Sequence, residues 1–557
     1  MASRTFDQNY ARKVVDGKIL ACEWVRLACQ RHIDDLDRPD FPYAFDVALA
    51  NRAINFIQLL PHTKGRWAAK RELLKLEPWQ RFIIGSLFGW VHKKTGLRRF
   101  REAYIEVARK NGKSILAAAI GVYMLVADSE YGAEVYAGAT TEKQAWQVFG
   151  PARLMCKNTP ELTEFYDLEV NASNLVRLED NSKMEPLIGN PGDGPSPSCA
   201  LVDEYHEHKS TDLFETMQTG MGAREQPLLA VITTAGSNMG GPCYEKRGEA
   251  SKILQGTFKD DQFFAIIYTL DKGDDWKKQR NWIKANPNMG VSVNKDYLKA
   301  QIASATRNPS KQSGVKTKNL NVWVGAKEAW VNMEQWADGA DSKLKESDFY
   351  GLHCVQSLDL ATKIDIAARI RVFTRYENGD DLHYYVFPKF YLPEGALESA
   401  KNASIYRGWA AAGHLELMDG EEISYAQVQE DVEKSASTHR VDEIVYDPWQ
   451  ATQMAQALRE KNLLAVEYRN TTANMSFAML ELEGALASGR LHHTNNPVLN
   501  WMASNVVAKK DANDNVFPRK ELPENKIDGM VGLIMGVGRA MHQENTGSLD
   551  DFLGSIA

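Results

Sequence analysis

The sequence contains little cysteine, and the cysteines that it has are far apart. There are six in 557 residues, and no two of them form a Cys-x-x-Cys pair. Proteins held together by disulfides and proteins that bind structural zinc usually carry closely spaced cysteine pairs. We therefore expect neither kind of site, and we interpret the cysteines as buried thiols of a protein from a reducing cytoplasm.

The sequence also lacks a long apolar run and a signal-like start. Residues 1–7 show no basic stretch followed by an apolar one, which is the pattern of a secretory signal peptide. The longest apolar run follows Ser114 and is too short to span a bilayer, which requires about 20 residues. Secretion and membrane insertion are therefore not expected, and no membrane partner is predicted.

An excess of positive charge is absent as well. The formal net charge is −7, with 66 basic and 73 acidic side chains. Proteins that hold nucleic acid permanently are usually basic, so we expect any DNA contact to be local, or to be made and released. The composition, 44% hydrophobic and 25% charged, is typical of a globular protein. A chain of 557 residues exceeds what one hydrophobic core usually organises, and we predict at least two domains.

A strand, a loop and a helix surround the triplet Gly112-Lys113-Ser114. Residues 103–107 have a strand pattern, and residues 115–124 form an apolar helical run. In a phosphate-binding loop of this kind, backbone N–H groups face the phosphates, the lysine ammonium neutralises them and the serine hydroxyl ligates Mg²⁺. We therefore predict an ATP site with Lys113 on the phosphates and Ser114 on Mg²⁺.

The loop departs from the usual pattern G-x-x-x-x-G-K-[ST], because Val107 stands where the first glycine is expected. A Gly-Lys-Ser triplet by itself is a weak signal, and an ordinary strand-to-helix turn is the alternative interpretation. The assignment therefore depends on motifs further along the chain.

Two adjacent acids follow a buried strand pattern. Strands and helices alternate after the phosphate loop, which indicates a mostly parallel sheet with helices on both faces. Residues 198–202 are small or apolar and lead into Asp203 and Glu204. This is the pattern of a Walker B site, in which Asp203 holds Mg²⁺ and Glu204 orients the attacking water; a solvated strand end is the alternative. We interpret His206 and His208, which have no third ligand nearby, as surface residues.

Two further segments carry residue types that a nucleotide site uses. A strand pattern over residues 228–232 leads into Thr233 and Thr234, whose hydroxyls we expect to sense the γ-phosphate, although a strand followed by a glycine turn is the alternative. Gln80 lies two residues after Pro78, near a predicted helix start. We predict that its amide reads the adenine edge, and a simple capped helix is the alternative.

Taken in order, these motifs resemble the large terminase subunit of tailed double-stranded DNA bacteriophages, the ATPase of the genome-packaging motor. The motifs that carry the resemblance are Pro78-Trp79-Gln80, Arg109-Lys110-Asn111-Gly112-Lys113-Ser114, Leu201-Val202-Asp203-Glu204 and Thr233-Thr234-Ala235. Phosphate loops of that family typically lack the first glycine and carry an arginine, as Val107 and Arg109 do here. The resemblance therefore implies that the loop from Arg109 to Ser114 binds ATP.

Two arginines are candidates for stabilising the transferred phosphate. Arg109 lies in the loop, and we predict that it acts as a sensor within its own subunit. Arg224 lies in a glycine-containing turn between the acid pair and Thr233. We predict that it is an arginine finger that reaches a neighbouring subunit.

The family also has a nuclease domain with an RNase H-like fold, and the rest of the sequence is consistent with one. Residues 325–350 are polar and indicate a linker. A strand with Asp359 follows, and after it come two strand patterns separated by Asn378-Gly379, which is a strong hairpin signal.

Three acids stand where the nuclease pattern of this family expects them. Asp359 lies on a strand, Asp447 ends another strand, and Asp528 begins a late helix. Strand-end solvation and an acidic first helical turn are the alternatives. Together the three acids supply the oxygen ligands that two Mg²⁺ or Mn²⁺ ions about 4 Å apart need for phosphodiester hydrolysis. Asp365 is a supporting acid.

We therefore predict an α/β protein with an N-terminal P-loop ATPase of the ASCE type, built on a mostly parallel sheet, and a C-terminal RNase H-like nuclease. The predicted parts are a helical segment (1–60), the ATPase domain (61–325), a linker (326–350), the nuclease domain (351–545) and a tail (546–557). The function that the resemblance implies is ATP-driven translocation of double-stranded viral DNA into a procapsid, with metal-dependent endonucleolytic cleavage of concatemeric DNA.

The resemblance also implies partners and a place of action. Members of this family form a ring, usually pentameric, on the portal vertex of the procapsid, and receive DNA from a small terminase subunit. We expect the chain to work in the cytoplasm of an infected bacterium, transiently on the portal protein. One alternative is a cellular ATP-dependent helicase or restriction-type nuclease, but further helicase motifs after Thr234 are not found. The other is a capsid-associated protein with a degenerate nucleotide site, which would lack Lys113 or Glu204, and both are present.

Overall fold

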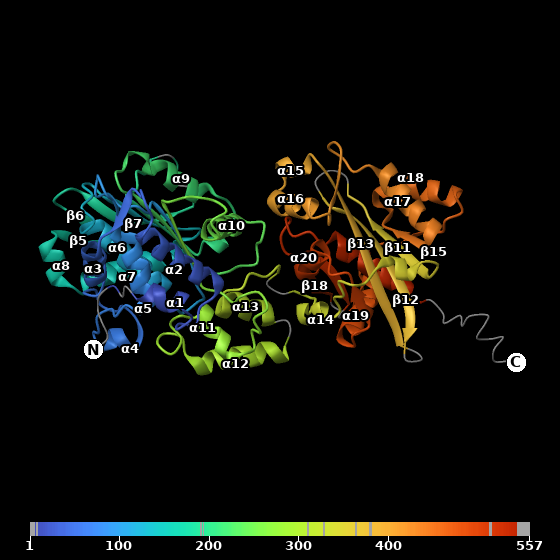
Figure 1. Cartoon of the computed structure of the whole chain (residues 1–557), viewed down its shortest axis with the longest axis horizontal. Helices are drawn as coiled ribbons and strands as arrows, with labels where there is room; N and C mark the ends of the chain where they lie inside the picture. The colour runs from blue at the N-terminus through green and yellow to red at the C-terminus, as the bar shows by residue number, and fades with distance from the viewer. Residues whose placement is uncertain are drawn as a thin grey trace. The chain divides into compact units, whose positions relative to one another are not determined.

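The computed structural model describes residues 6, 9–189, 192, 194–308, 311–326, 329–361, 365–377, 381–511 and 515–542. The chain forms two compact units, Met1–Val324 and Gly325–Ala557, and each contains its own sheet (Figure 1). The predicted Asn378-Gly379 turn and the predicted tail (546–557) lie outside the described residues. No helix in these described ranges is long and apolar enough to cross a membrane.

An eight-stranded sheet forms the centre of the first unit, and β1 and β2 pair separately. The strands of this unit are β1 (Tyr43–Phe45), β2 (Trp90–His92), β3 (Glu102–Glu106), β4 (Glu134–Ala139), β5 (Leu168–Val170), β6 (Leu175–Arg177), β7 (Ser182–Ile188), β8 (Cys199–Asp203), β9 (Leu228–Thr233) and β10 (Phe263–Ile267). The order is β10-β3-β9-β8-β4-β7-β6-β5, with parallel pairs from β10 to β7 and antiparallel pairs beyond. Because neighbouring parallel strands end at one edge, β3, β9 and β8 carry their last residues to the same side of the sheet.

Helices cover the sheet of the first unit. They are α1 (Tyr10–Val15), α2 (Glu23–Leu36), α3 (Val47–Ile57), α4 (Gly65–Ala69), α5 (Pro78–Gly89), α6 (Lys113–Val126), α7 (Glu142–Lys157), α8 (Pro160–Phe165), α9 (Asp212–Gly220), α10 (Pro242–Leu254), α11 (Trp282–Ala285), α12 (Lys295–Arg307) and α13 (Gln312–Leu320), with 3₁₀ turns η1 (Tyr205–Glu207), η2 (Met221–Ala223) and η3 (Gln279–Asn281). Every residue of β8 and β9 is buried, as expected for parallel strands covered on both faces.

The N-terminal helices belong to the same hydrophobic core as this sheet. Val25 of α2 and Ile54 of α3 are fully buried in the cluster that also contains Ile105 of β3 and Val231 of β9. The segment predicted as a separate helical part (1–60) therefore packs, where it is described, as part of the first unit.

The second unit is built on a mixed sheet. Its strands are β11 (His353–Asp359), β12 (Ala367–Glu377), β13 (Asp381–Pro393), β14 (Glu416–Met418), β15 (Arg440–Tyr446), β16 (Ala465–Glu467), β17 (Leu491–His493), β18 (Val506–Lys510) and β19 (Val516–Lys520). The order is β14-β13-β12-β11-β15-β16; β12 is antiparallel to both of its neighbours, and the other pairs, including β17 on β13, are parallel. Strands β18 and β19 form a separate antiparallel hairpin.

The helices of the second unit are α14 (Met333–Asp338), α15 (Ala396–Ser399), α16 (Ala403–Ala411), α17 (Tyr425–Thr438), α18 (Pro448–Glu460), α19 (Thr472–Ala487), α20 (Pro497–Asn505) and α21 (Asp528–Ala540), with the 3₁₀ turn η5 (Glu346–Phe349). The stretch predicted as a linker (326–350) thus contains α14 and η5. The predicted fold class is confirmed: the protein is α/β, with two mixed, mostly parallel sheets.

Helix α21 lies unusually close to the second sheet because two glycines face it. A Cβ atom added to Gly536 would come within 2.8 Å of Val372, and one added to Gly532 within 3.0 Å of Ile370. The hydroxyl of Ser357 in β11 donates to the carbonyl of Gly532 at 2.6 Å. This close contact holds the first residue of α21, which is Asp528, beside the central strands.

Candidate functional site

The phosphate loop of the first unit connects β3 to α6. Lys110 (φ 71°) and Gly112 (φ 85°) both have left-handed backbone, which folds the loop back before α6 begins at Lys113. The side chain of Lys113 is buried, and its ammonium donates to the carbonyl of Val107 at 3.2 Å, across the loop. Burial lowers the pKa of Lys113, while the charges of Glu204 and Asp203 act in the opposite direction. The loop therefore encloses one cation that faces two acids.

Asp203 and Glu204 lie at the end of β8, next to the start of α6. The hydroxyl of Ser114 donates to Asp203 Oδ2 at 3.3 Å, so the two predicted Mg²⁺ ligands lie together. Glu204 has a left-handed backbone conformation (φ 47°, ψ 46°), which is uncommon for a residue with a Cβ atom. Strained conformations of this kind are concentrated at functional sites.

The two acids have opposite pKa shifts. Burial and the neighbouring charge of Glu204 raise the pKa of Asp203 to about 6. Burial also acts to raise the pKa of Glu204, but the Lys113 ammonium and a hydrogen bond from His206 outweigh it and lower that pKa to about 2. Glu204 is therefore ionised at neutral pH, as a group that accepts a proton or orients water must be.

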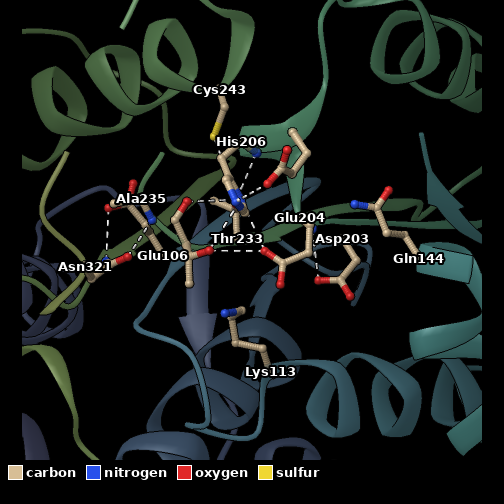
Figure 2. Close-up of polar contacts among 12 residues, drawn as sticks. Glu106, Lys113, Gln144, Asp203, Glu204, His206, Thr233, Ala235, Cys243 and Asn321 are labelled. Carbon is tan, nitrogen blue, oxygen red and sulfur yellow. Dashed lines mark hydrogen bonds and ion pairs between the residues drawn. The ribbon is translucent and has the colours of Figure 1, made fainter. Parts of the chain in front are cut away.

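The end of β9 contacts this acid pair. The hydroxyl of Thr234 donates to Glu204 Oε2 at 3.2 Å, and Thr233 Oγ1 accepts the backbone N–H of His206 at 3.1 Å. The backbone N–H of Val107 donates to the carbonyl of Thr233 at 3.1 Å. The structure therefore brings the predicted threonines, the acid pair and the loop together at one edge of the sheet (Figure 2).

The surface interpretation of the two histidines is wrong. His208 is only 5% exposed, and burial lowers its pKa to about 4. The side chain of His206 is 7% exposed and lies 3.2 Å from Glu204 Oε2, measured from Nδ1. The spacing of Asp203, Glu204 and His206 was visible in the sequence. The turn η1 folds the chain back after the acid pair, and this turn was not predicted.

Sequence analysis also missed Glu106, the last residue of β3, which is fully buried. Its carboxylate accepts hydrogen bonds from the hydroxyl of Tyr104 at 2.6 Å, from Asn321 Nδ2 at 3.1 Å and from Trp323 Nε1 at 3.3 Å. Asn321 Oδ1 in turn accepts the backbone N–H of Ala235 at 2.6 Å. An acid within an apolar strand was the available signal, but its partners come from distant segments.

The loop residues before Gly112 are held from behind by the segment around α11. Asn111 is fully buried; its Nδ2 donates to Asn286 Oδ1 at 3.1 Å, and its Oδ1 accepts the backbone N–H of Asn288 at 3.0 Å. The side chain of Asn111 therefore shapes the loop from inside. The backbone N–H of Arg109 donates to the carbonyl of Lys318 at 2.9 Å, and Arg109 Nε is buried with no hydrogen-bond partner among the described residues.

Arg224 does not have the freedom that an arginine finger needs. Its Nε donates to the carbonyl of Ser196 at 2.9 Å, and its guanidinium lies 3.4 Å from Glu134 and 3.7 Å from Glu130. The side chain is 14% exposed. Glu134 begins β4, and Ser196 precedes β8, so these contacts lie at the sheet edge opposite Asp203. Arg224 is a structural cross-link in this conformation, which gives no support to the finger prediction.

A cavity of about 460 Å³ opens beside the start of α6 and is lined by both Gly112 and Gln80. Gln80 Oε1 accepts the backbone N–H of Glu77 at 2.9 Å, which forms the capping box of α5. The rings of His62 and Trp67, which also line the cavity, are stacked with their centroids 5.0 Å apart. Gln80 therefore caps a helix, as the alternative interpretation held, and also faces a cavity next to the phosphate loop.

The predicted acids of the second unit influence one another. Asp359 ends β11, Asp447 follows β15, and these neighbouring strands are parallel, so both acids lie at the same edge. Burial raises the pKa of Asp359 well above its usual value, and the charges of Asp528, Asp447 and Asp365 raise it further. Burial, followed by the charge of Asp365, raises the pKa of Asp528 to about 6. We call these four residues the acidic cluster.

The partners of the acidic cluster differ from member to member. Asp528 Oδ2 is buried and accepts no hydrogen bond from the described residues. Asp447 Oδ2 accepts Asn470 Nδ2 at 2.5 Å, and Asp365 forms an ion pair with Lys526. Within the described ranges, no three His, Cys, Asp or Glu side chains are already arranged to hold a metal ion. The donors are all carboxylate oxygens, which suit Mg²⁺ and Mn²⁺, and the orphaned oxygen of Asp528 is consistent with such a ligand.

Two family models match the chain. The model described as "Terminase large subunit, ATPase domain" matches residues 78–252, and the model described as "Terminase large subunit, endonuclease domain" matches residues 257–544. The first match contains the phosphate loop and the acid pair, and the second contains the acidic cluster. The second match begins within the first compact unit, which ends at Val324.

Individual proteins are also similar to this chain. Protein YmfN of Escherichia coli (strain K12) is 41% identical over 389 residues, which are 68% of this chain and 86% of that protein. The terminase large subunit of Enterobacteria phage HK97 is 28% identical over 492 residues, which are 86% of this chain and 94% of that protein. The crystal structure of the HK97 large terminase is 25% identical, covers 88% of this chain and 99% of that chain, and superimposes with a TM-score of 0.43.

Proposed function

The chain belongs to the terminase large subunit family and contains its ATPase and endonuclease domains, and on this basis we propose that it is the motor that packages viral DNA. The observation that carries the proposal is the presence of two separate acidic sites on one chain. One site has a phosphate loop with Lys113 facing Glu204, and the other is the cluster of four aspartates in the second unit. ATP hydrolysis in the first unit would drive double-stranded DNA into the procapsid, and the second unit would cut concatemeric DNA.

We propose that ATP binds with its phosphates along the loop from Arg109 to Ser114. Lys113 would neutralise the phosphates, and Ser114 and Asp203 would hold a Mg²⁺ ion that neutralises part of the phosphate charge. Glu204 orients the attacking water and accepts its proton. The 3.3 Å contact between Ser114 and Asp203 supports a shared ion, because both oxygens can reach one point.

The base of the nucleotide has a suitable cavity. Gly112 of the phosphate loop lines the 460 Å³ cavity, and its wall also contains Gln80 and the stacked rings of His62 and Trp67. An aromatic wall and one amide are the features that bind a flat, polar base. We propose that the adenine base lies here and that Gln80 Nε2 contacts its edge, since the Oε1 atom caps α5.

The second unit is proposed to cut DNA with two Mg²⁺ or Mn²⁺ ions held by Asp359, Asp447 and Asp528, with Asp365 in support. When bound, such ions lower the pKa of the attacking water and stabilise the leaving oxygen. The raised pKa of Asp359 supports this assignment, because several carboxylates crowded together need cations. Asn470 orients Asp447 through the 2.5 Å hydrogen bond to Oδ2.

Basic side chains border the acidic cluster and suit the phosphates of DNA. Lys520 of β19 lies close enough to lower the pKa of both Asp359 and Asp528. A cavity of about 630 Å³ is lined by Lys509, Lys510 and Arg519 of the same hairpin, together with residues such as Asn470, Thr471 and Phe517. We propose that this hairpin contacts the DNA backbone next to the cutting site.

The proposed partners are those of a packaging machine. We propose a homo-oligomeric ring, of five copies in the form usual for the family, on the portal protein of the procapsid, with a small terminase subunit delivering DNA in the cytoplasm of the infected bacterium. A packaging assay with purified procapsids and linear DNA tests this. ATP-driven protection of the DNA from DNase is the expected result. ATP hydrolysis and DNA cleavage without any protected DNA would favour the alternative, a cellular ATP-dependent helicase or restriction-type nuclease.

A further inference from the structure

The imidazole of His206 lies between two carboxylates at the centre of the ATPase site. Its Nδ1 is 3.2 Å from Glu204 Oε2, and its Nε2 is 3.3 Å from Glu207 Oε1. Figure 2 shows the contacts that converge on this ring. An ionised carboxylate only accepts hydrogen bonds, and a neutral imidazole has one donor. Both contacts are satisfied together only when the ring carries two protons, so the geometry favours the imidazolium ion.

The ring is also held by β9. Its Nδ1 lies 3.1 Å from Thr233 Oγ1 and 3.4 Å from Thr234 Oγ1, and the backbone N–H of His206 donates to Thr233 Oγ1 at 3.1 Å. Gly236 makes room for His206, because a Cβ atom there would come within 3.2 Å of the Cβ of His206 and within 3.3 Å of the ring atom Cδ2. The orientation of the imidazole is therefore fixed by the end of β9, whose threonines the sequence predicts to sense the γ-phosphate.

The contacts of His206 and Thr234 with Glu204 use the same oxygen, Oε2. Two donors on one oxygen fix the rotation of the carboxylate and leave the other oxygen, Oε1, to take the proton of the attacking water. The left-handed backbone of Glu204 restricts the remaining freedom of the side chain. The orientation of the Glu204 carboxylate therefore depends on the two hydrogen bonds that it accepts from His206 and Thr234.

We propose that His206 is a positioning residue for ATP hydrolysis: as an imidazolium between Glu204 and Glu207, it holds the catalytic carboxylate in the orientation needed to activate water. This inference rests on the proposed nucleotide site and adds a residue to it. The positioning role of His206 is distinct from that of Lys113, which contacts the phosphates directly. Loss of His206 should therefore slow the chemical step and leave nucleotide binding unchanged.

A pair of amide variants separates positioning from folding. The amide nitrogen of Asn occupies nearly the place of the imidazole Nδ1, whereas that of Gln occupies nearly the place of Nε2. His206→Asn should keep the donor to Glu204 and retain most of the turnover. His206→Gln and His206→Ala should lose about tenfold to a hundredfold in single-turnover hydrolysis, the worth of one hydrogen bond to a charged group, with unchanged ATP affinity. The exposed His414 of the second unit serves as a control, since His414→Gln should change nothing.

The dependence of turnover on pH gives a second readout. The carboxylates that face the ring are those of Glu204 and Glu207, and its sequence neighbour His208 is buried. The end of β9 presents the hydroxyls of Thr233 and Thr234, and α10, which packs against η1, presents the thiol of Cys243 at 3.9 Å from Thr233 Oγ1. Burial by itself would lower the pKa of His206, but these carboxylates raise it above its ordinary value. Wild-type turnover should therefore fall as the pH rises through that pKa, because the neutral ring has only one N–H donor for two carboxylates and no longer keeps it on Glu204. His206→Asn should lack this fall, and Glu207→Gln should move it to lower pH.

Single-turnover hydrolysis and fluorescence measurements of nucleotide binding test whether His206 positions Glu204. Equal rates for the Asn and Gln variants, or an unchanged alkaline fall in His206→Asn, would overturn the role of His206. Wild-type hydrolysis by Glu204→Gln is a different failure, because it would remove the proposed nucleotide site itself.

Discussion

Glu204 in the first unit and Asp528 in the second are both acids of a candidate active site, but their neighbours differ. Glu204 Oε2 has two hydrogen-bond partners, and the ammonium of Lys113 lowers the pKa of the carboxyl to about 2. Asp528 Oδ2 accepts no hydrogen bond from the part of the chain that the structure describes, and burial beside Asp365 raises the pKa of Asp528 to about 6. The cation beside Glu204 outweighs the effect of burial on its pKa, whereas Lys520 near Asp359 and Asp528 does not outweigh burial and the neighbouring carboxylates.

This difference indicates two ways of building an acidic site. In the first unit, side chains fixed by the sheet already hold the catalytic acid in one orientation. In the second, burial and neighbouring carboxylates raise the pKa of the acids, and a bound cation would compensate their charge. The first site should therefore tolerate the absence of its metal better than the second. Four predictions test this comparison.

The largest effect is expected from Glu204→Gln, because this change removes the ionised group from a site that is otherwise intact. Hydrolysis should fall by about a hundredfold to ten-thousandfold, the usual contribution of a general base. ATP binding should remain, whereas Lys113→Ala should weaken binding itself, because Lys113 meets charge that is already present in the bound ATP. Equilibrium binding and single-turnover hydrolysis measure the two effects, with the exposed Glu169→Gln as a matched control. If Glu204→Gln hydrolysed ATP at the wild-type rate, Glu204 would not be the catalytic acid of the first unit.

The next effect concerns cleavage by the acidic cluster. Asp447→Asn keeps the shape of the side chain and removes one charge, so plasmid cleavage in Mn²⁺ should fall by orders of magnitude while ATP hydrolysis stays near the wild-type rate. The exposed Asp419→Asn of the same unit is the control and should cleave normally. If Asp447→Asn abolishes ATP hydrolysis in a folded protein, the two sites are not independent and the assignment of the cluster is wrong.

A smaller effect is expected on stability. Mg²⁺ or Mn²⁺ should stabilise the second unit by about 2.7 kcal/mol at a hundred times the dissociation constant. For a unit of this size that corresponds to a rise of roughly 5–10 °C in its melting temperature. Calorimetry without nucleotide measures it, and Asp528→Asn should both raise the metal-free melting temperature and reduce the gain from metal. An equal gain in the variant would mean that the ion binds elsewhere.

The smallest effect is expected from Arg224→Ala. The change removes hydrogen bonds to Ser196 and Glu134, so the first unit should lose about 1 kcal/mol of stability. Hydrolysis should remain near wild type, because Arg224 is a cross-link rather than a finger in this structure. Subunit mixing tests the alternative: if Arg224→Ala and Glu204→Gln proteins restore activity when mixed, Arg224 acts on a neighbouring subunit after all.

Short sequence patterns were sufficient to predict that both sites lie at the ends of parallel strands. The order of a strand, Gly112-Lys113-Ser114 and an apolar helix predicts where Lys113 lies, because a parallel sheet presents its strand ends on one side. The same rule brings Asp359 and Asp447 together from strands about ninety residues apart. These predictions depend on periodicity and on strand ends, both of which are written in short stretches of sequence.

The surroundings of each acid were decided only by the tertiary structure. The sequence shows that His206 follows Glu204, but not that η1 turns its ring back onto the carboxylate. It likewise shows an acid at Glu106, but the partner Asn321 comes from the far end of the first unit. Orientation, burial and pKa depend on groups that are distant in the chain and close in space. Sequence pattern therefore predicted the phosphate loop, the acid pair and the four aspartates, because most of these residues stand at the end of a strand or the start of a helix. Packing alone placed His206 and Glu106 beside the strand ends of the first unit and Arg224 at the opposite edge of the sheet.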